Sequence, residues 1–249
     1  MKLQHKNVVV TGGASGFGAG IVSRFLDEGA NVTIVDFDET AAMAYIQSLK
    51  SDRVFFEYAN LAEGESVKDL FGRLRRRWKQ LDILINNAGT THLPALMEDV
   101  SEEDFDKVLA VNAKSVYYTS KHAVPWMKQK ATGAIINIAS TAALSPRPKL
   151  TWYNASKGWL VTATKSMAIE LAPDGIRVNA ICPVAGETPL LTSFMGGDTP
   201  ETREKFLTSI PLGRFSTPAD IAATALYLSS DEAAMITGVA LEVDGGRCI

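Results

Sequence analysis

Three polar side chains in the second half of the chain have the types and spacing needed for proton transfer. Tyr153 and Lys157 stand four residues apart in Tyr-Asn-Ala-Ser-Lys, and Ser140 lies thirteen residues before Tyr153. A tyrosine phenol has a pKa of about 10, which a nearby ammonium lowers by stabilising the phenolate. Residues four apart share one face of a helix, although a helix can also bring Tyr and Lys to this spacing by chance. With Ser140 binding a substrate oxygen, the set could move a proton at a carbonyl or an alcohol.

A glycine-rich segment near the start of the chain has the form of a phosphate-binding turn. Gly12, Gly16 and Gly18 follow a predicted strand and precede a predicted helix. Glycines let the backbone turn tightly and approach a phosphate, and the helix that follows offers free N–H groups to the anion. A glycine-rich turn alone is a weak signal, but this one stands in the position that a dinucleotide site requires.

Asp36 ends the second predicted strand, eighteen residues after Gly18. A carboxylate at this distance is expected to accept hydrogen bonds from the adenine ribose hydroxyls and to repel the 2′-phosphate of NADP. No Lys or Arg compensates at the neighbouring positions Ala14, Ser15, Phe37 and Asp38. The sequence therefore favours NAD, and the alternative is that Asp36 merely ends a strand.

Short β-branched runs alternate with longer helical stretches along the whole chain. The predicted strands are Asn7–Thr11, Asn31–Asp36, Val54–Tyr58, Asp82–Asn86, Ala134–Ala139, Arg177–Ile181 and Val239–Val243. Unbroken apolar runs are typical of strands buried on both faces, and the connections are long enough for crossover helices. We predict an α/β fold: a doubly wound, Rossmann-like parallel sheet of about seven strands with helices on both faces, forming a single domain over residues 1–249.

Two long helices are expected beside the candidate site. Ser101 precedes three acidic residues, which is typical of a helix start, and this helix is predicted over about Glu102–Trp126. Pro125 could kink or terminate it. A second helix is predicted over Asn154–Leu171, and the Gly- and Pro-rich segment from 186 to 200 resembles a mobile lid.

Composition excludes several classes of protein. The 249 residues carry a formal net charge of −3, which gives no reason to expect nucleic acid, and the basic run 73–79 is interpreted as a solvated helix end. Two cysteines indicate a reducing compartment, and three scattered histidines offer no metal-ligand spacing. The sequence shows neither a signal peptide nor an apolar run long enough to span a membrane, so a cytoplasmic protein is expected.

The chain resembles the short-chain dehydrogenase/reductase family over essentially its full length. The shared motifs, in the family's order and spacing, are Thr11-Gly12-x-x-x-Gly16-x-Gly18, Asn86-Asn87-Ala88-Gly89, Asn112, Ser140, Tyr153-x-x-x-Lys157 and Pro183-x-x-x-x-Thr188. The resemblance implies that Tyr153 is the catalytic acid/base and that Ser140 orients the substrate oxygen. It also implies that Lys157 lowers the pKa of Tyr153 and binds the nicotinamide ribose, and that Asn112 holds a water of a proton relay.

The resemblance further implies a set of cofactor contacts, at Gly12, Ser15, Gly16, Phe17, Gly18, Asp36, Phe37, Asn60, Leu61, Asn87, Ala88, Gly89, Tyr153, Lys157, Pro183, Gly186 and Thr188. Two departures from the family pattern stand out. Asn60 replaces a common Asp near the adenine, and the usual Pro-Gly after the sixth strand is Pro183-Val184-Ala185-Gly186. The backbone around the nicotinamide is therefore expected to differ from the family's.

The leading functional hypothesis is an NAD(H)-dependent oxidoreductase that interconverts a secondary alcohol and a ketone, with a small-molecule substrate. A reductase of 3-oxoacyl groups on a carrier protein is the alternative, and a catalytically idle binding protein is less consistent with the intact motif. The candidate substrate-pocket residues are Thr91, His92, Thr141, Ala142, Arg147, Trp152, Glu187, Leu190, Phe194 and Met195. His92 could contact substrate or lie in an exposed loop, and Arg147 could bind an acid or face solvent.

A homotetramer is expected, mostly from the resemblance, with the two long helices pairing across one two-fold axis and the C-terminal strand across another. Consecutive apolar or aromatic residues at 116–118 and 159–161 require each long helix to bury more than one face. The apolar last residue, Ile249, suggests a docked chain end.

Overall fold

Runs of Val and Ile form strands that are covered on both faces. In β1 (Asn7–Thr11), Val8, Val9 and Val10 are completely buried. Val8 and Val10 belong to one apolar cluster and Val9 to a second, because successive side chains of a strand point to opposite faces. An unbroken apolar run is thus the signature of a sheet between two helical layers.

The computed structural model describes residues 1–249 and has one parallel sheet of seven strands in the order β3-β2-β1-β4-β5-β6-β7. The remaining strands are β2 (Asn31–Asp36), β3 (Val54–Tyr58), β4 (Ile83–Asn86), β5 (Gly133–Ile138), β6 (Ile176–Pro183) and β7 (Ala240–Val243). The predicted doubly wound α/β sheet is confirmed. Among the strands the largest difference in bounds is at β6, which continues to Pro183 because Cys182 and Pro183 pair with Glu242 and Val243 of β7. The helix predicted over Asn154–Leu171 begins three residues earlier, at Thr151.

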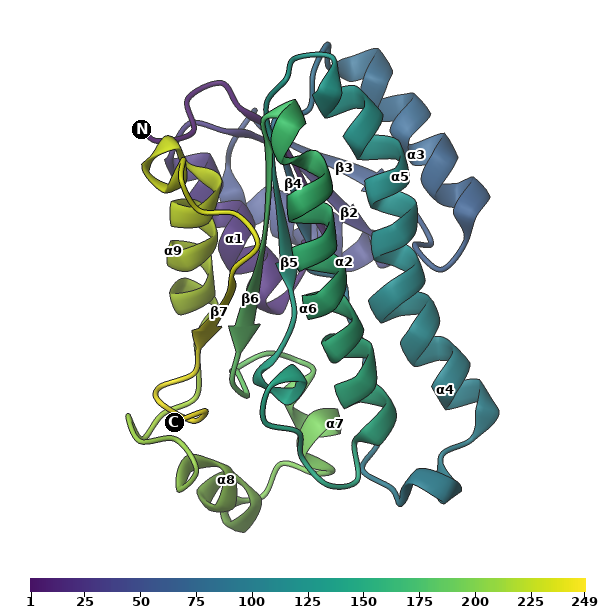
Figure 1. Cartoon of the computed structure of the whole chain (residues 1–249), viewed down its shortest axis with the longest axis vertical. Helices are drawn as coiled ribbons and strands as arrows, with labels where there is room; N and C mark the ends of the chain where they lie inside the picture. The colour runs from purple at the N-terminus through teal and green to yellow at the C-terminus, as the bar shows by residue number, and fades with distance from the viewer.

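Helices cover both faces of the sheet (Figure 1). One layer contains α1 (Gly16–Asp27), α2 (Glu39–Leu49) and α9 (Pro218–Ser229). The other contains α3 (Gly64–Arg77), α5 (Ser115–Lys128) and α6 (Thr151–Leu171). Short 3₁₀ helices lie at Met97–Asp99, Thr141–Ala143, Ala172–Asp174 and Asp231–Ala233.

The long helix predicted over about Glu102–Trp126 is interrupted. It consists of α4 (Glu102–Leu109), a π-helical turn (Ala110–Lys114) and α5. Ser101 caps α4 as predicted, with its hydroxyl accepting from the Asp104 N–H at 3.1 Å. Pro125 lies inside α5 and does not terminate it, since the helix continues to Lys128.

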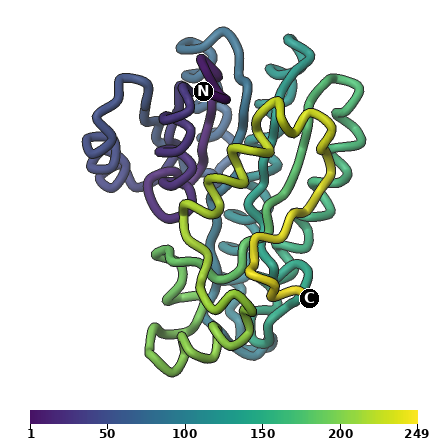
Figure 2. The backbone as a smooth tube through the Cα atoms, turned by 90° about the vertical axis from the view of Figure 1, so that its left-hand side faces the viewer, coloured from purple at the N-terminus to yellow at the C-terminus, as the bar shows by residue number.

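The segment predicted to resemble a lid contains two short helices, α7 (Leu191–Met195) and α8 (Pro200–Leu207). Figure 2 shows this segment at the lower end of the molecule, which is the end toward which the strand arrows point in Figure 1. Arg203 of α8 binds two carboxylates, donating to Glu187 at 2.9 Å and to Asp198 at 2.5 Å. These ion pairs tie α8 back to the chain that leaves β6.

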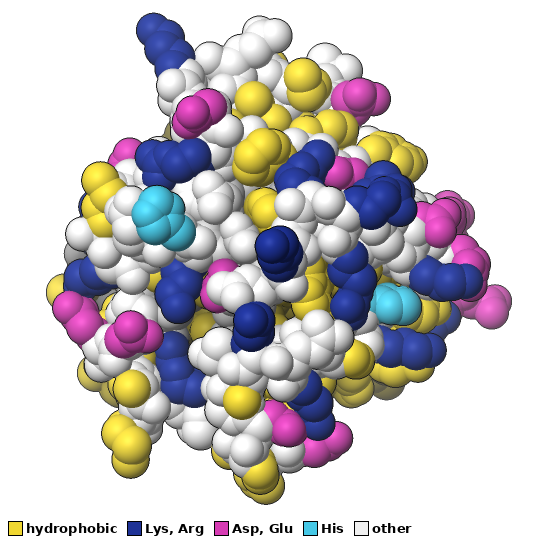
Figure 3. All heavy atoms as spheres, turned by 90° about the horizontal axis from the view of Figure 1, so that it is seen from above, with side chains coloured by type: hydrophobic (Ala, Val, Ile, Leu, Met, Phe, Trp, Pro, Cys, Tyr) yellow, Lys and Arg dark blue, Asp and Glu magenta, His cyan; other side chains and the backbone are white.

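Charges at the opposite end of the sheet are dispersed. Figure 3 looks onto that end and shows Lys and Arg side chains scattered among uncharged and acidic ones. The basic run at the end of α3 is only partly solvated, since Arg73 and Arg77 both pair with Glu57 at 2.6 and 2.9 Å.

None of the helices has the length and apolarity needed to cross a membrane.

Candidate active site

A cleft of about 500 Å³ lies at the carboxyl end of the sheet, where doubly wound folds bind ligands. Nearly all of the residues predicted to touch cofactor or substrate oxygen line it: Gly12, Ser15, Gly16, Phe17, Asp36, Phe37, Asn60, Leu61, Asn87, Ala88, Gly89, Ser140, Tyr153, Lys157, Pro183, Gly186 and Thr188. Gly18 and Asn112 do not line it.

The glycine-rich turn has the backbone that only glycine adopts easily. Gly12 and Gly16 have φ values of 61° and 55°, in the left-handed region. A Cβ on Gly18 would lie 2.1 Å from the Gly12 carbonyl oxygen, so Gly18 is required for the turn to close. The cradle left by these missing side chains leads into the N-terminus of α1 and fits a pyrophosphate.

Thr11 and Asn87 hold the ends of β1 and β4 together beneath this turn. The Asn87 amide donates to the carbonyls of Thr11 and Gly12 at 3.0 and 2.9 Å. The Thr11 hydroxyl accepts from the N–H groups of Asn87 and Ala88 at 2.9 and 3.1 Å. The adjacent loops that would face a dinucleotide are therefore fixed by side chains rather than by sheet pairing alone.

Asp36 sits at the end of β2 with its carboxylate at the cleft. It accepts from the N–H groups of Ala14, Phe37 and Asp38 at 3.2, 2.9 and 3.2 Å. Three backbone donors fix the carboxylate beside the glycine turn and leave acceptor capacity for a ligand hydroxyl. Phe37 beside it is exposed and also lines the cleft, so its ring gives an apolar surface for the adenine of a dinucleotide.

Asn60 mainly organises its own loop. Its amide oxygen accepts from the Ala62 N–H at 3.1 Å, and its amide nitrogen donates to Glu63 at 2.7 Å. The replacement of a common Asp by Asn60 thus keeps the local turn, with Leu61 beside it in the cleft wall.

Ser140 and Tyr153 lie at the inner end of the cleft, on the loop after β5 and in the first turn of α6. The Ser140 oxygen accepts from the Ala142 N–H at 3.1 Å, so its hydroxyl hydrogen is free to donate. Burial raises the pKa of Tyr153 to about 12, and a hydrogen bond with Ser140 opposes this rise. The direction differs from our expectation that Lys157 lowers this pKa, because removal of the phenol from water outweighs the hydrogen bond with Ser140.

Lys157 is buried in the cleft floor one helical turn after Tyr153. Its Nζ donates to the Ile138 carbonyl at 2.9 Å and lies 5.9 Å from the centroid of the Tyr153 ring. Burial lowers the pKa of Lys157 to about 8. Of the two side chains, Lys157 therefore gives up its proton first, at about pH 8, while Tyr153 stays protonated.

Asn112 lies in the π-helical turn, where hydrogen bonds run five residues back and the helix bulges. Its amide accepts from the Thr90 N–H at 2.8 Å, and donates to the Thr90 carbonyl at 2.9 Å and to Ser156 at 3.0 Å. The side chain thus ties the loop after β4 to α6. The water contact implied by the resemblance stays a prediction.

The segment after β6, which departs from the family's usual Pro-Gly, is held by a β-bridge. Gly186 forms a parallel bridge with Ser216, whose hydroxyl donates to the Val184 carbonyl at 3.2 Å. A Cβ at Gly186 would lie 2.2 Å from the Phe17 ring, so the displaced glycine makes room for this aromatic residue. Thr188 follows and packs against Gly16 across the mouth of the cleft.

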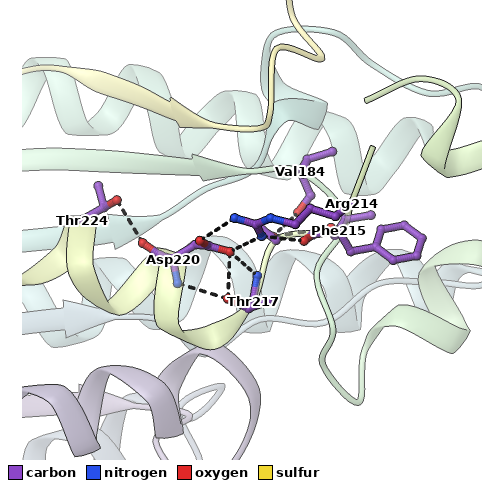
Figure 4. Close-up of polar contacts among 8 residues, drawn as sticks. Val184, Arg214, Phe215, Thr217, Asp220 and Thr224 are labelled. Carbon is purple, nitrogen blue, oxygen red and sulfur yellow. Dashed lines mark hydrogen bonds and ion pairs between the residues drawn. The ribbon is translucent and has the colours of Figure 1, made fainter. Parts of the chain in front are cut away.

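The start of α9, directly after Ser216, is held by a set of polar contacts around Asp220 (Figure 4). Thr217 and Asp220 form a capping box, and Arg214 donates to both oxygens of Asp220 at 2.6 and 2.9 Å. A hydrogen bond from Arg214 holds the pKa of Asp220 well below its usual range.

The structure brings only part of the predicted substrate pocket to the cleft. Leu190 and Phe194 line it, whereas Thr91, His92, Thr141, Ala142, Arg147, Trp152, Glu187 and Met195 do not. His92 is buried rather than exposed, with its Nδ1 at 2.7 Å from the Leu93 carbonyl. The sequence reasoning missed Lys107 and Val111, which line the cleft and lie four residues apart on α4 and the π-helical turn.

Comparisons with known proteins agree on one family. A family model described as enoyl-(acyl carrier protein) reductase matches residues 12–247. The 4-formylbenzenesulfonate dehydrogenase of Comamonas testosteroni is 42% identical over 254 residues, covering 100% of both chains. The D-beta-hydroxybutyrate dehydrogenase of Cupriavidus necator is 36% identical and covers 98% of each chain.

A solved structure shows the same fold at similar identity. The 3-ketoacyl-(acyl-carrier-protein) reductase from Brucella melitensis, complexed with NADH, has a TM-score of 0.94 and 44% identity, and covers 99% of this chain and 100% of that one. The family match, the full-length relatives and the similar solved structure all agree with the geometry of the cleft. The chain belongs to the short-chain dehydrogenase/reductase family, and it is an oxidoreductase that uses a nicotinamide cofactor and acts on CH–OH groups.

Proposed function

We propose that the protein is an NAD(H)-dependent dehydrogenase/reductase that interconverts a secondary alcohol and a ketone. One observation carries the proposal: Asp36 lies at one end of the cleft, and Ser140, Tyr153 and Lys157 converge at the other. Residues 1–249 would act as a single domain, since cofactor and substrate residues come from loops of the same sheet.

The roles of the side chains follow from their environment. The bound nicotinamide would supply or accept the hydride. Ser140 donates a hydrogen bond to the substrate oxygen, and Tyr153 gives a proton to that oxygen during reduction or takes it during oxidation. Lys157 shares the proton of the pair and holds the ribose, and Asn112 keeps the loop and helix in register around them.

Asp36 supports NAD over NADP. Its carboxylate is fixed by three backbone N–H groups, so it cannot easily swing away from a 2′-phosphate. The Brucella structure was obtained with NADH, and its likeness to this chain is consistent with the same preference.

A reductase of 3-oxoacyl groups on a carrier protein is the second candidate. The similarity to the Brucella reductase favours it, as does a 35% identical 3-oxoacyl-[acyl-carrier-protein] reductase of Thermotoga maritima that the chain covers completely. Turnover of a 3-oxoacyl thioester with an efficiency above that of free ketones would select this candidate.

We further propose a cytoplasmic homotetramer. Two free cysteines, Cys182 and Cys248, suit a reducing compartment. Tyr117 of α5 and Trp159 of α6 are 53% and 44% exposed in the single chain, and Ile249 is fully exposed. Large apolar side chains on both long helices and at the chain end are what two self-complementary interfaces would cover.

The experiment that tests the function follows nicotinamide absorbance with NADH and, separately, NADPH over a panel of ketones. We expect turnover of at least one ketone with NADH and little with NADPH. Binding of NADH without turnover of any ketone, alcohol or thioester would favour an idle member of the family, and a preference for NADPH would contradict the role of Asp36.

A further inference from the structure

Arg147 is firmly held although it lies outside the cleft. It stands between Pro146 and Pro148, whose rings restrict the loop, and the Asn154 amide donates to its carbonyl at 2.8 Å. Its guanidinium donates to the Ser209 hydroxyl at 3.1 Å. The residue therefore connects the loop before α6 to the end of α8, 62 positions away.

The flat face of Arg147 lies on an aromatic ring. The guanidinium carbon is 4.1 Å from the centroid of Phe206, well inside the range of a cation–π contact. The ion pairs of the chain do not include Arg147, so the ring is the main group that offsets its partial burial. Burial, together with the charge of Arg247, lowers the pKa of Arg147 to about 10.

Two aromatic rings lead from Arg147 to the catalytic tyrosine. Phe206 contacts Phe194 edge to face at 5.9 Å, and Phe194 contacts Tyr153 in the same way at 5.5 Å. Phe194 lines the cleft, whereas Phe206 stands behind it. The position of Phe194, and with it the width of the cleft beside Tyr153, thus depends on a ring that Arg147 holds.

The substrate end of the cleft is apolar around this wall. Phe194 and Tyr153 pack in one apolar cluster with Ala142, Leu150, Ala185 and Phe206, and Leu190 and Leu191 also line the cleft. The charged side chains that line the cleft are Asp36, Lys107 and Lys157, of which only Lys157 is near the reacting groups. Lys157 already donates to the Ile138 carbonyl and is assigned to the nicotinamide ribose, so a carboxylate against the Phe194 wall would lose its water without gaining a partner, which is unfavourable.

We propose that Arg147 is a positioning residue that holds the Phe206–Phe194 wall behind Tyr153, and that the cleft therefore takes ketones and alcohols with an uncharged, flat apolar substituent. This inference rests on the proposed function and names its substrate class.

The test compares acetophenone, 2-butanone and acetoacetate as substrates with NADH. The parent should prefer acetophenone to acetoacetate in kcat/KM by at least about tenfold. Arg147→Ala and Arg147→Lys should each lower the preference for acetophenone over 2-butanone by about tenfold, because lysine keeps the charge but has no flat face to stack. Both variants should keep the dissociation constant of NADH.

Arg203→Ala is the matched control. It removes the other arginine that ties α8 down, through Glu187 and Asp198, but leaves the Phe206 stack intact. We expect its preference among ketones to stay near that of the parent. An equal change in Arg203→Ala would mean that general loosening of α8 is responsible, and an unchanged preference in Arg147→Ala, or a parent that prefers acetoacetate, would overturn the proposal.

Calorimetry separates a failure of this inference from a failure of the proposed function. The dissociation constants of acetophenone and 2-butanone, measured with NAD⁺ in place of NADH so that no hydride is available, give the preference between the two ketones without turnover. If no ketone is turned over, the proposed function fails, while a binding ratio that shifts between the parent and Arg147→Lys still supports the role of Arg147. A binding ratio that is equal in both proteins counts against it.

Discussion

Asp36 should decide the choice of cofactor. Its carboxylate is placed by backbone N–H groups and not by a counter-ion, so its negative charge remains available to repel a phosphate. In Asp36→Ala we expect weaker NAD binding and a preference for NAD over NADP that shrinks by about tenfold or more. Titration calorimetry with both nucleotides measures this, and equal binding of the two by the unaltered protein would refute it.

The Tyr153–Lys157 pair should govern the pH dependence of oxidation. The first proton of the pair leaves near the lowered pKa of Lys157, at about 8, and the second only near the raised pKa of Tyr153, at about 12. Alcohol oxidation needs the pair to accept a proton, so its rate should rise as pH increases through the first value, and ketone reduction should fall.

Rates should be measured under conditions in which a deuterated alcohol is oxidised more slowly than the unlabelled alcohol. Such an isotope effect shows that hydride transfer limits turnover. An oxidation rate that falls with pH across this range would contradict the assigned roles of the pair.

At the scale of elements, α9 positions the segment that follows β6. The capping box of Thr217 and Asp220 starts the helix, and Ser216 before it pairs with Gly186. Replacing Asp220 by Ala should destabilise the protein by about 1–2 kcal/mol, because the cap and an exposed ion pair are lost together. Chemical denaturation of both proteins at neutral pH checks the magnitude.

The Asp220 contribution should depend on pH in a defined direction. Arg214 lowers the folded-state pKa of Asp220, so its stabilisation is present above the unfolded value of about 3.9 and is lost as the pH falls toward the folded value. The deficit of Asp220→Asn relative to the parent should therefore shrink in acid. A deficit that grows as pH falls would show that the charge of Asp220 is not stabilising.

Local patterns in the sequence predicted the helices and strands well. The features that these patterns could not predict depend on contacts between residues far apart in the chain. Tyr153 and Lys157 follow from their spacing, and Asp36 follows from its place at a strand end. The π-turn that contains Asn112 has no distinct apolar period, so a single long helix was expected. The stacking of Arg147 on Phe206 joins residues far apart in the chain, and the raised pKa of Tyr153 depends on burial that only the folded protein defines.

At the scale of the whole molecule, self-association should cover the exposed aromatic residues of α5 and α6. Trp159→Glu places a charge in the middle of this surface and should convert the expected tetramer to a smaller species in light scattering. Met235→Glu is the control, since Met235 is 97% exposed but lies on a different segment, after α9. A parent that is monomeric at micromolar concentration, or identical effects of the two substitutions, would refute the proposed assembly.

The most direct test of the catalytic assignment is Tyr153→Phe, assayed by nicotinamide absorbance with the ketone that the parent reduces best. Phenylalanine keeps the ring that packs against Phe194 but has no proton to give. We predict a loss of about 100- to 10,000-fold in kcat, the range that general acid–base catalysis contributes, with NADH binding nearly unchanged. A variant that retains activity close to that of the parent would show that Tyr153 is not the acid/base of this enzyme.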